Sequence, residues 1–215
     1  MRILLASIAL LAAGIPAAAE AGSASDVVRI FGRDPGASAA HACFVRRYTK
    51  AHLASHPNQN VTMMMAYVTK PEGSDSYYGI NLEVRFRQLS RPFQVSGSCN
   101  ENPETGALGC GVECDGGSLS VRVKDDRSIL VSIPESVRLF DPSATEEGDD
   151  LPRGARFGSD DKLFRLDRAA LADCLPVIYD EDVKAGVMSG AITQCPEETP
   201  CCFPAASSSP ASSPA

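Results

Sequence analysis

One short stretch decides the fold: Gly79–Arg87, which reads GINLEVRFR. Its apolar residues, Ile80, Leu82, Val84 and Phe86, alternate with polar ones. Successive side chains of a strand point to opposite faces, so this alternation gives one apolar face and one polar face. A helix would scatter both kinds of residue around its whole circumference. The stretch therefore predicts a β-strand with one buried face.

The same period of two recurs through residues 42–172, which indicates a series of such strands. Ser118–Lys124 is the next clearest strand, and Asp125–Ser128 reads as a turn into Ile129–Ile133, so these two strands are expected to form a hairpin. About nine short strands with turns between them predict a mainly all-β fold, an antiparallel β-barrel or sandwich. The weaker strand candidates are Ala42–Tyr48, Val61–Thr69, Pro92–Ser98, Ala107–Cys114, Ser136–Phe140 and Lys162–Leu166.

Predicted helices are few and short. Thr49–His56 must end before Pro57, because a residue that precedes proline is pushed out of the helical conformation. Leu166–Leu171 is a second candidate. Asp180–Met188 is a third, and it has acidic residues at its start, where the helix dipole favours them.

The N-terminus has the layout of an export signal. Arg2 precedes an apolar run from Ile3 to Ile15, and the small residues Ala17–Ala19 follow before Glu20. The run is shorter than the roughly 20 residues that a membrane-spanning helix needs. Charged, Pro or Gly positions interrupt every later segment, so we expect no transmembrane span. The predicted location is the periplasm or the exterior of the cell, in soluble form.

The chain is expected to divide into four parts. A signal peptide at residues 1–19 precedes a β-rich domain at 26–180 and a Cys- and Pro-containing extension at 181–203. Residues 204–215 contain only Pro, Ala and Ser. Such a composition cannot bury enough apolar surface to offset the entropy of ordering, so it predicts a disordered tail.

The charge balance bears on the class of partner. The chain carries 27 acidic and 20 basic residues, for a net charge of −7 at neutral pH. Proteins that bind nucleic acid neutralise phosphates with clustered Lys and Arg. The composition therefore argues against a nucleic-acid partner.

The cysteines predict a fold that is crosslinked by disulfides. An even set of eight in an exported chain is typical of a disulfide framework, although spacing alone does not choose the pairs. A soft-metal site is the alternative, but zinc sites show paired short spacings that are missing here. The disulfide candidates are Cys43, Cys99, Cys110, Cys114, Cys174, Cys195, Cys201 and Cys202.

The three histidines offer the one enzyme hypothesis. His52 and His56 are four residues apart, so a helix would place both rings on one face, and His41 could complete a metal site. However, Leu53 follows His52 where a metalloprotease helix carries glutamate. No nucleophile elbow is present in the sequence. We expect no cofactor, and a metal-assisted hydrolase that uses His41, His52 and His56 remains the alternative function.

A pair of adjacent tyrosines is a candidate contact for a partner. Tyr77 and Tyr78 end a predicted loop, and an exposed tyrosine offers apolar area with a polar tip, a combination common at interfaces. Packing of the pair under a neighbouring loop is the alternative. The candidate contact residues are Tyr77, Tyr78, His52 and His56.

Three stretches, His52–Val61, Cys110–Gly117 and Phe164–Arg168, together resemble a group of small exported bacterial proteins of uncharacterised function. The resemblance covers most of the region from Ala42 to Cys174 and implies a periplasmic location. It implies no catalytic residue. Because the sequence predicts a disulfide-linked, strand-rich body without a recognisable catalytic set, the leading hypothesis is a non-catalytic, β-rich binding module of the periplasm, whose partner is a protein or small-molecule ligand of the cell envelope. A structural component of the envelope is a further alternative.

Overall fold

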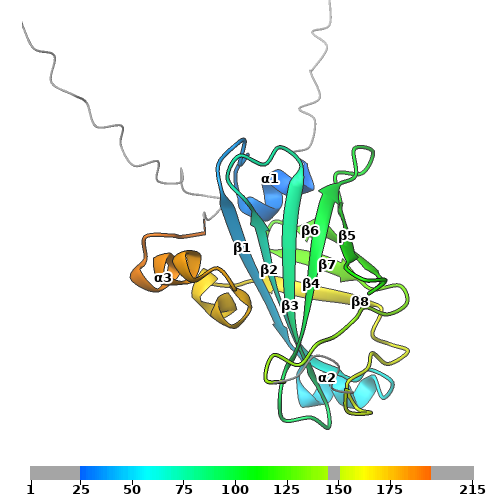
Figure 1. Cartoon of the computed structure of the whole chain (residues 1–215). Helices are drawn as coiled ribbons and strands as arrows, with labels where there is room; N and C mark the ends of the chain where they lie inside the picture. The colour runs from blue at the N-terminus through cyan, green and yellow to red at the C-terminus, as the bar shows by residue number, and fades with distance from the viewer. Residues whose placement is uncertain (1–24, 145–150, 195–215) are drawn as a thin grey trace, which may run out of the picture.

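The fold is a closed antiparallel barrel of eight strands, in which each strand pairs with the next along the chain and the last pairs with the first (Figure 1). The computed structural model describes residues 25–144 and 151–194. The prediction of a mainly all-β barrel is confirmed, and closure excludes the sandwich. The strands are β1 (Ala40–Arg47), β2 (Val61–Lys70), β3 (Tyr77–Phe86), β4 (Phe93–Glu101), β5 (Leu108–Val112), β6 (Ser118–Asp125), β7 (Ser128–Ser132) and β8 (Leu163–Arg168).

The expected ninth strand, Ser136–Phe140, is wrong. This segment makes only isolated bridges, between Gly117 and Val137 and between Gln94 and Phe140. The barrel is already closed by β8, and β5 pairs only with the second half of β4, from Gly97 onward. The segment therefore covers the part of the β4 edge that β5 leaves unpaired.

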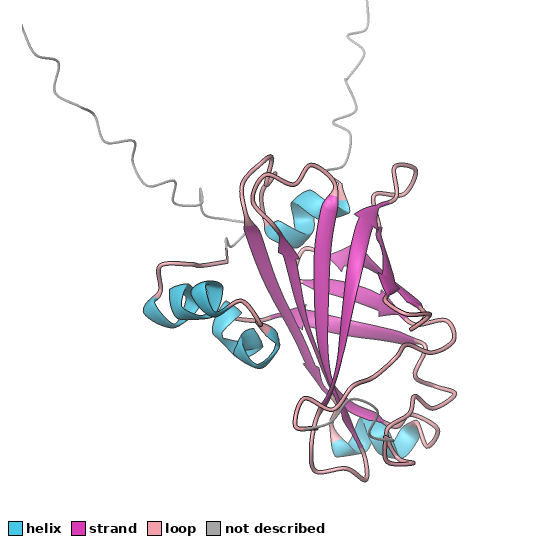
Figure 2. Cartoon of the chain, in the orientation of Figure 1, coloured by secondary structure: helices cyan, strands magenta, loops and turns pink. Residues whose placement is uncertain are grey.

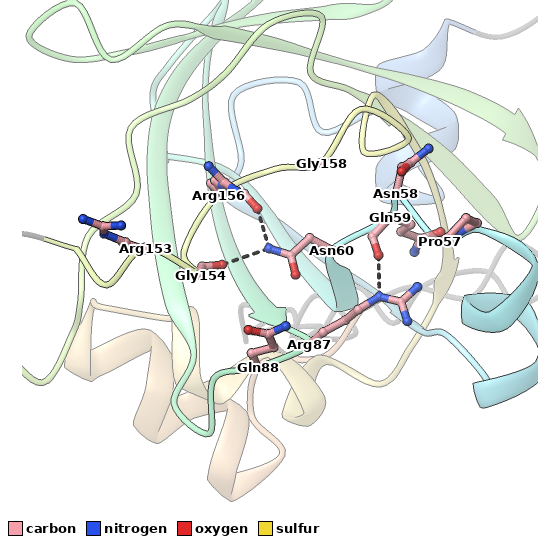
Figure 3. A pocket seen from close by; sticks show the side chains of 10 residues that line it. All are labelled: Pro57, Asn58, Gln59, Asn60, Arg87, Gln88, Arg153, Gly154, Arg156 and Gly158. Carbon is pink, nitrogen blue, oxygen red and sulfur yellow. Dashed lines mark hydrogen bonds between the residues drawn. The ribbon is translucent and has the colours of Figure 1, made fainter.

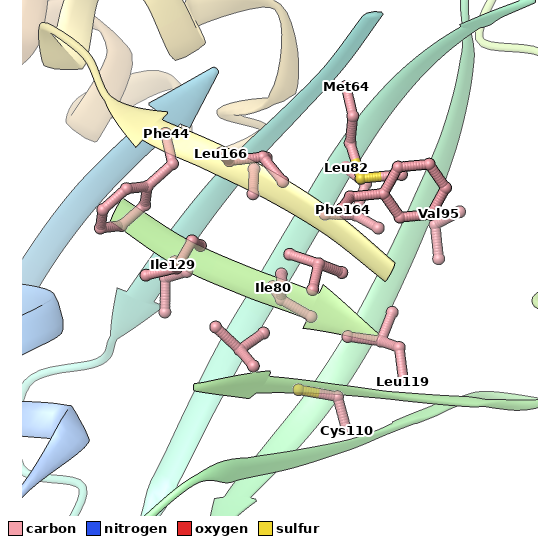
Figure 4. Packing of buried hydrophobic residues seen from close by; sticks show 14 of the residues in the cluster. Phe44, Met64, Ile80, Leu82, Val95, Cys110, Leu119, Ile129, Phe164 and Leu166 are labelled. Carbon is pink, nitrogen blue, oxygen red and sulfur yellow. The ribbon is translucent and has the colours of Figure 1, made fainter. Parts of the chain in front are cut away.

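Side chains fill the barrel interior. The alternating residues Ile80, Leu82, Val84 and Phe86 of β3 all point inward and are at most 2% exposed, as the sequence pattern predicts. A barrel of eight strands is just wide enough for such side chains to meet across its axis. Figure 4 shows this packing, to which other strands contribute Phe44, Met64, Val95, Cys110, Leu119, Ile129, Phe164 and Leu166.

A short helix that the sequence analysis missed, α1 (Asp26–Phe31), covers one end of the barrel (Figure 1). Its residues Val27, Ile30 and Phe31 join the interior cluster. The Ser25 side chain caps its start, accepting from the Val28 amide. Six residues are too few for a detectable helical period, which explains why the pattern gave no signal.

Helix α2 (Lys50–Ser55) lies at the other end of the barrel (Figures 1 and 2) and confirms the helix predicted at Thr49–His56. Thr49 caps it, accepting from the His52 amide at 3.1 Å.

A second layer packs on the outside of β1, β2 and β3. It consists of the 3-10 helix η1 (Leu171–Val177) and helix α3 (Glu181–Ser189), which confirms the predicted helix at Asp180–Met188. None of the described helices is long and apolar enough to cross a bilayer. The layer rests on an apolar cluster made of Cys43, Met63, Met65 and Tyr67 from the barrel and Leu171, Cys174, Val177, Ile178 and Val187 from the helices. Because β2 is covered on both faces, its sequence is almost continuously apolar.

The predicted helix at Leu166–Leu171 is wrong. Strand β8 runs to Arg168, and its residues alternate between Phe164 and Leu166, which face inward, and exposed neighbours. Pairing with both β7 and β1 holds this segment extended.

Two disulfides form among the described residues. Cys43–Cys174 joins β1 to η1, and Cys99–Cys110 links directly opposed positions of β4 and β5. Cys114, on the turn between β5 and β6, is exposed and pairs with none of the other described cysteines, so its expected bridge is not formed within this part of the chain. Cys195, Cys201 and Cys202 lie outside the described residues.

The two disulfides should stabilise the protein unequally. Cys43–Cys174 closes a loop of 131 residues and Cys99–Cys110 one of 11. Loop-closure entropy gives about 4 to 5 kcal/mol for the long loop and about 3 kcal/mol for the short one. We expect Cys43→Ala/Cys174→Ala to lower the free energy of unfolding in urea more than Cys99→Ala/Cys110→Ala. The reverse order would contradict this prediction.

Thiol chemistry should separate Cys114 from the four cysteines that are bridged within the described part of the chain. Iodoacetamide applied to the native protein without reductant should modify Cys114 and leave Cys43, Cys99, Cys110 and Cys174 unmodified. Peptide mapping by mass spectrometry reads each site separately, and the same sample unfolded with reductant is the control in which all five react. An unmodified Cys114 in the native sample would show that it is bridged after all.

Candidate functional site

The outer surface of β3 and β4 carries a groove of about 510 Å³, here named the tyrosine groove. Its residues come from strands β2 to β5, from the β5–β6 turn, from the segment around Phe140 and from the segment around Tyr179. The lining residues are Thr69, Pro71, Tyr77, Gly79, Asn81, Ser96, Gly97, Ser98, Val112, Glu113, Cys114, Arg138, Phe140 and Tyr179.

Exposed aromatic side chains concentrate in this groove. Tyr77, Phe140 and Tyr179 are 47%, 39% and 46% exposed, and only Leu163 and Met188 join them as exposed large hydrophobic residues of the described chain. Three of these five residues therefore line a single groove. Aromatic side chains held in an accessible groove are typical of binding surfaces.

The floor of the tyrosine groove is polar and uncharged. Asn81 donates from Nδ2 to the Val177 carbonyl at 2.9 Å and accepts at Oδ1 from the Ser96 hydroxyl at 2.9 Å. The hydroxyls of Tyr77 and Ser98 lie 3.3 Å apart. These groups are fixed by one another, so they present hydrogen-bonding atoms in defined positions. Gly97 lies between them, where a Cβ atom would come within 3.1 Å of the Gly111 carbonyl oxygen.

Tyr179 is fixed by the barrel although it is half exposed. Its hydroxyl donates to Gln94 Oε1 at 2.9 Å, and Gln94 Nε2 in turn donates to the Pro176 carbonyl at 3.1 Å. Burial of the hydroxyl raises the pKa of Tyr179 to about 12, and the negative charge of Glu83 adds to this effect. The hydroxyl therefore stays protonated at physiological pH, and its hydrogen bond to Gln94 fixes the side chain where it lines the groove.

The end of the tyrosine groove nearest the β5–β6 turn carries the charged groups. Arg138 donates to the Cys114 carbonyl at 2.7 Å, which holds the turn in place. Cys114 and Asp115 both adopt positive φ angles, of 55° and 58°. The residues Cys114–Gly117 thus form a tight turn in which the two non-glycine residues Cys114 and Asp115 take the left-handed conformation.

The two adjacent tyrosines have different positions. Tyr77 lies in the groove, but Tyr78 is 4% exposed, belongs to the interior cluster and stacks on Phe31 of α1. The expectation that both contact a partner is therefore wrong for Tyr78. Neighbouring strand residues point to opposite faces, so only one of the pair can face outward.

The structure does not bring the three histidines together. His41 is the second residue of β1, and its Nδ1 lies 2.7 Å from the Tyr67 hydroxyl. His52 and His56 lie on and beside α2, beyond the other end of β1. The rings of His52 and His56 stack with centroids 4.1 Å apart, and His52 Nε2 donates to Gln59 Oε1 at 2.9 Å. Among the described residues, no group of three His, Cys, Asp or Glu is arranged to hold a metal ion. The predicted metal site is therefore not formed there.

A second pocket, here named the arginine pocket, lies at the α2 end of the barrel and has a volume of about 400 Å³. The sequence gives no sign of this pocket, because its residues come from three distant segments that only the fold brings together. Figure 3 shows its lining residues, Pro57, Asn58, Gln59, Asn60, Arg87, Gln88, Arg153, Gly154, Arg156 and Gly158.

Asp161 holds the walls of the arginine pocket together. Its buried carboxylate accepts from the backbone amides of Asn60, Val61 and Gly158, at 2.7, 3.1 and 2.8 Å. Burial raises the pKa of Asp161, and the three backbone hydrogen bonds oppose that shift. The carboxylate thus joins the start of β2 to the segment that precedes β8.

Comparison with protein-family models, with curated proteins and with solved structures finds no match for the chain.

The raised pKa of Asp161 predicts a pH dependence of stability. A carboxyl group whose pKa is higher in the folded state contributes stability below its unfolded value of 3.8, and this contribution is lost as the pH rises through the raised value. We expect urea unfolding between about pH 4 and pH 7 to show wild type losing stability relative to Asp161→Asn as the pH rises. The opposite slope would show that the hydrogen bonds to the carboxylate outweigh its burial.

Proposed function

We propose that the protein is an exported, non-catalytic binding module of the cell envelope that recognises a partner protein through the tyrosine groove. The filled barrel interior carries this proposal. A barrel that transports a small apolar ligand needs an internal cavity, whereas this interior is packed with side chains such as Phe44, Phe86 and Phe164. Recognition therefore falls to the outer surface.

The chemistry of the tyrosine groove favours a segment of a protein partner. Exposed rings at Tyr77, Phe140 and Tyr179 suit apolar or aromatic side chains. The amide of Asn81 and the hydroxyls of Ser96 and Ser98 suit the peptide groups between those side chains. The floor of the groove carries no charge, so the expected segment is itself largely uncharged.

Two features support export. The N-terminal stretch has the layout of a signal peptide. In addition, the two disulfides are typical of proteins that fold in an oxidising compartment such as the periplasm.

Site-specific photo-crosslinking tests the proposal. A benzoylphenylalanine placed at Tyr179 should yield a discrete crosslinked product with a protein of an envelope fraction, because the residue is 46% exposed within the groove. Leu163 is 52% exposed outside the groove, so the same reagent placed there is the matched control and should give no such product. Products shared by both positions, or no product at Tyr179, would contradict a partner in the groove.

A second variant links the crosslink to the groove itself. Tyr77→Ala combined with Phe140→Ala should weaken capture at Tyr179 by at least about tenfold, as expected when aromatic anchors of an interface are truncated. Met188→Ala, which truncates a 72% exposed residue elsewhere, should leave it unchanged. Thermal unfolding of each variant checks that the barrel stays intact.

A further inference from the structure

The arginine pocket is an unusual feature of an acidic protein. Three arginines, Arg87, Arg153 and Arg156, line it, and none of the described residues that line it is acidic. The whole chain carries a net charge of −7. The pocket is therefore positively charged although the chain as a whole is negatively charged.

Pairing distinguishes these arginines from others on the barrel. Arg46, Arg85 and Arg91, for example, form ion pairs with carboxylates at 2.7 to 3.1 Å. Within the described part of the chain, the guanidinium groups of Arg153 and Arg156 have neither an ion pair nor a hydrogen bond. Their positive charge is available to a ligand.

Arg87 differs from these two because the protein holds it in place. Its Nε donates to the Gln59 carbonyl at 2.6 Å, and its Nη2 donates to the carbonyls of Leu53 and His56 at 2.6 and 2.8 Å. These acceptors are neutral, so they fix the orientation of the guanidinium without cancelling its charge. Its Nη1 donates to no described residue, which leaves donors for a ligand.

The pocket walls are also fixed before any ligand arrives. Asn60 donates from Nδ2 to the carbonyls of Gly154 and Arg156, at 2.9 and 2.7 Å, as Figure 3 shows between the two walls. The two walls touch at Gly158, where a Cβ atom would lie 1.9 Å from the Asn58 carbonyl oxygen, so only glycine permits this approach. A site whose walls are already ordered loses little entropy when it binds a ligand.

We propose that the arginine pocket binds a small phosphorylated ligand. The planar guanidinium group matches the oxygens of phosphate and donates to two of them at once. The volume of about 400 Å³ lies within the range of small-molecule sites, and Asn58 and Gln88 supply neutral hydrogen-bonding groups for the rest of such a molecule. The pocket is distinct from the tyrosine groove and shares no lining residue with it.

Isothermal titration calorimetry on the mature protein tests the site with two probes, inorganic phosphate and glycerol phosphate, with glycerol as the blank. At low ionic strength, saturable binding of glycerol phosphate with a dissociation constant of about 1 mM or tighter is expected. Added sodium chloride should weaken it. Tighter binding of glycerol phosphate than of inorganic phosphate supports an organic phosphate as the ligand, and equal binding supports recognition of the phosphate group alone.

Matched variants assign the binding to the pocket. Arg153→Gln/Arg156→Gln should weaken it by about tenfold or more, because each charge-assisted hydrogen bond is strong. Gln88→Glu, which places a negative charge in the pocket, should weaken it through repulsion. Arg122→Gln removes an exposed arginine of β6 outside the pocket and should have no effect.

Three results would overturn the proposal: no saturable heat with either probe, an unchanged affinity in both pocket variants, or an equal loss in Arg122→Gln. Far-UV circular dichroism of each variant confirms that the barrel is intact. Since these probes bear only on the pocket, their failure would leave the tyrosine groove and its crosslinking test unaffected.

Discussion

Closure of the barrel between β1 and β8 is the constraint on which the rest of the structure depends. Strand β1 pairs with β2 along its whole length, but with β8 only at Phe44–Arg168 and Val45–Asp167. So short a seam supplies few backbone hydrogen bonds. Its stability must come from side chains and from the covalent bridge beside it.

Those side-chain contacts are concentrated at the seam. Arg46 and Asp167 form an ion pair at 2.7 Å, and the Arg168 guanidinium lies over the Phe44 ring, 4.8 Å from its centroid. Arg168 also donates to the carbonyls of Arg29 and Ile30 at the end of α1. Arg168, which pairs with Phe44 at the seam, therefore also holds α1 in place over one end of the barrel. Next to it, the Ala169 amide donates to the Cys43 carbonyl, and Cys43 is bridged to Cys174.

The same bridge shapes the tyrosine groove. Cys174 anchors η1 on the outside of β1, and the end of η1 accepts hydrogen bonds from two strand residues: Val177 from Asn81 and Pro176 from Gln94. Tyr179 follows directly and is held by Gln94. The wall of the tyrosine groove that contains Tyr179 is thus attached to the barrel through η1. The disulfide that anchors η1 also lies beside the seam between β1 and β8. Reduction of the long disulfide would therefore loosen the seam and the groove together.

Much of the barrel could be predicted from the sequence, because alternation is a local signal. It was clear in β3, where apolar inward residues alternate with polar outward ones. It was weaker in β2, because the outer face of its run Met63–Tyr67 is covered by η1 and α3, which lie far along the chain. The segment Ser136–Phe140 alternates too, yet the closed barrel leaves it only part of one strand edge. An alternating segment becomes a strand only where another strand has an unpaired edge for it to join. The local sequence carries no information about which edges are unpaired.

The candidate sites were harder to predict, for a related reason. The different positions of Tyr77 and Tyr78 follow from strand geometry, and the pattern of Ile80 and Leu82 fixes which of the two faces inward. That signal was present in the sequence. The arginine pocket had no comparable signal, because Arg87 and Arg153 are brought to one place only by barrel closure and by the return of the chain past α2.

Asp161 connects this topology to the chemistry of the pocket. A buried carboxylate is destabilising unless hydrogen bonds compensate for its lost hydration. Here three backbone amides offset part of that cost, although burial still raises the pKa of Asp161. Those amides belong to the two walls of the arginine pocket, so the hydrogen bonds that satisfy Asp161 also fix the spacing between Asn60 and Gly158. The carboxylate faces the backbone and does not line the pocket itself. The Asp161 carboxylate therefore fixes the backbone of the pocket walls, while the arginines that line the pocket make its surface positively charged.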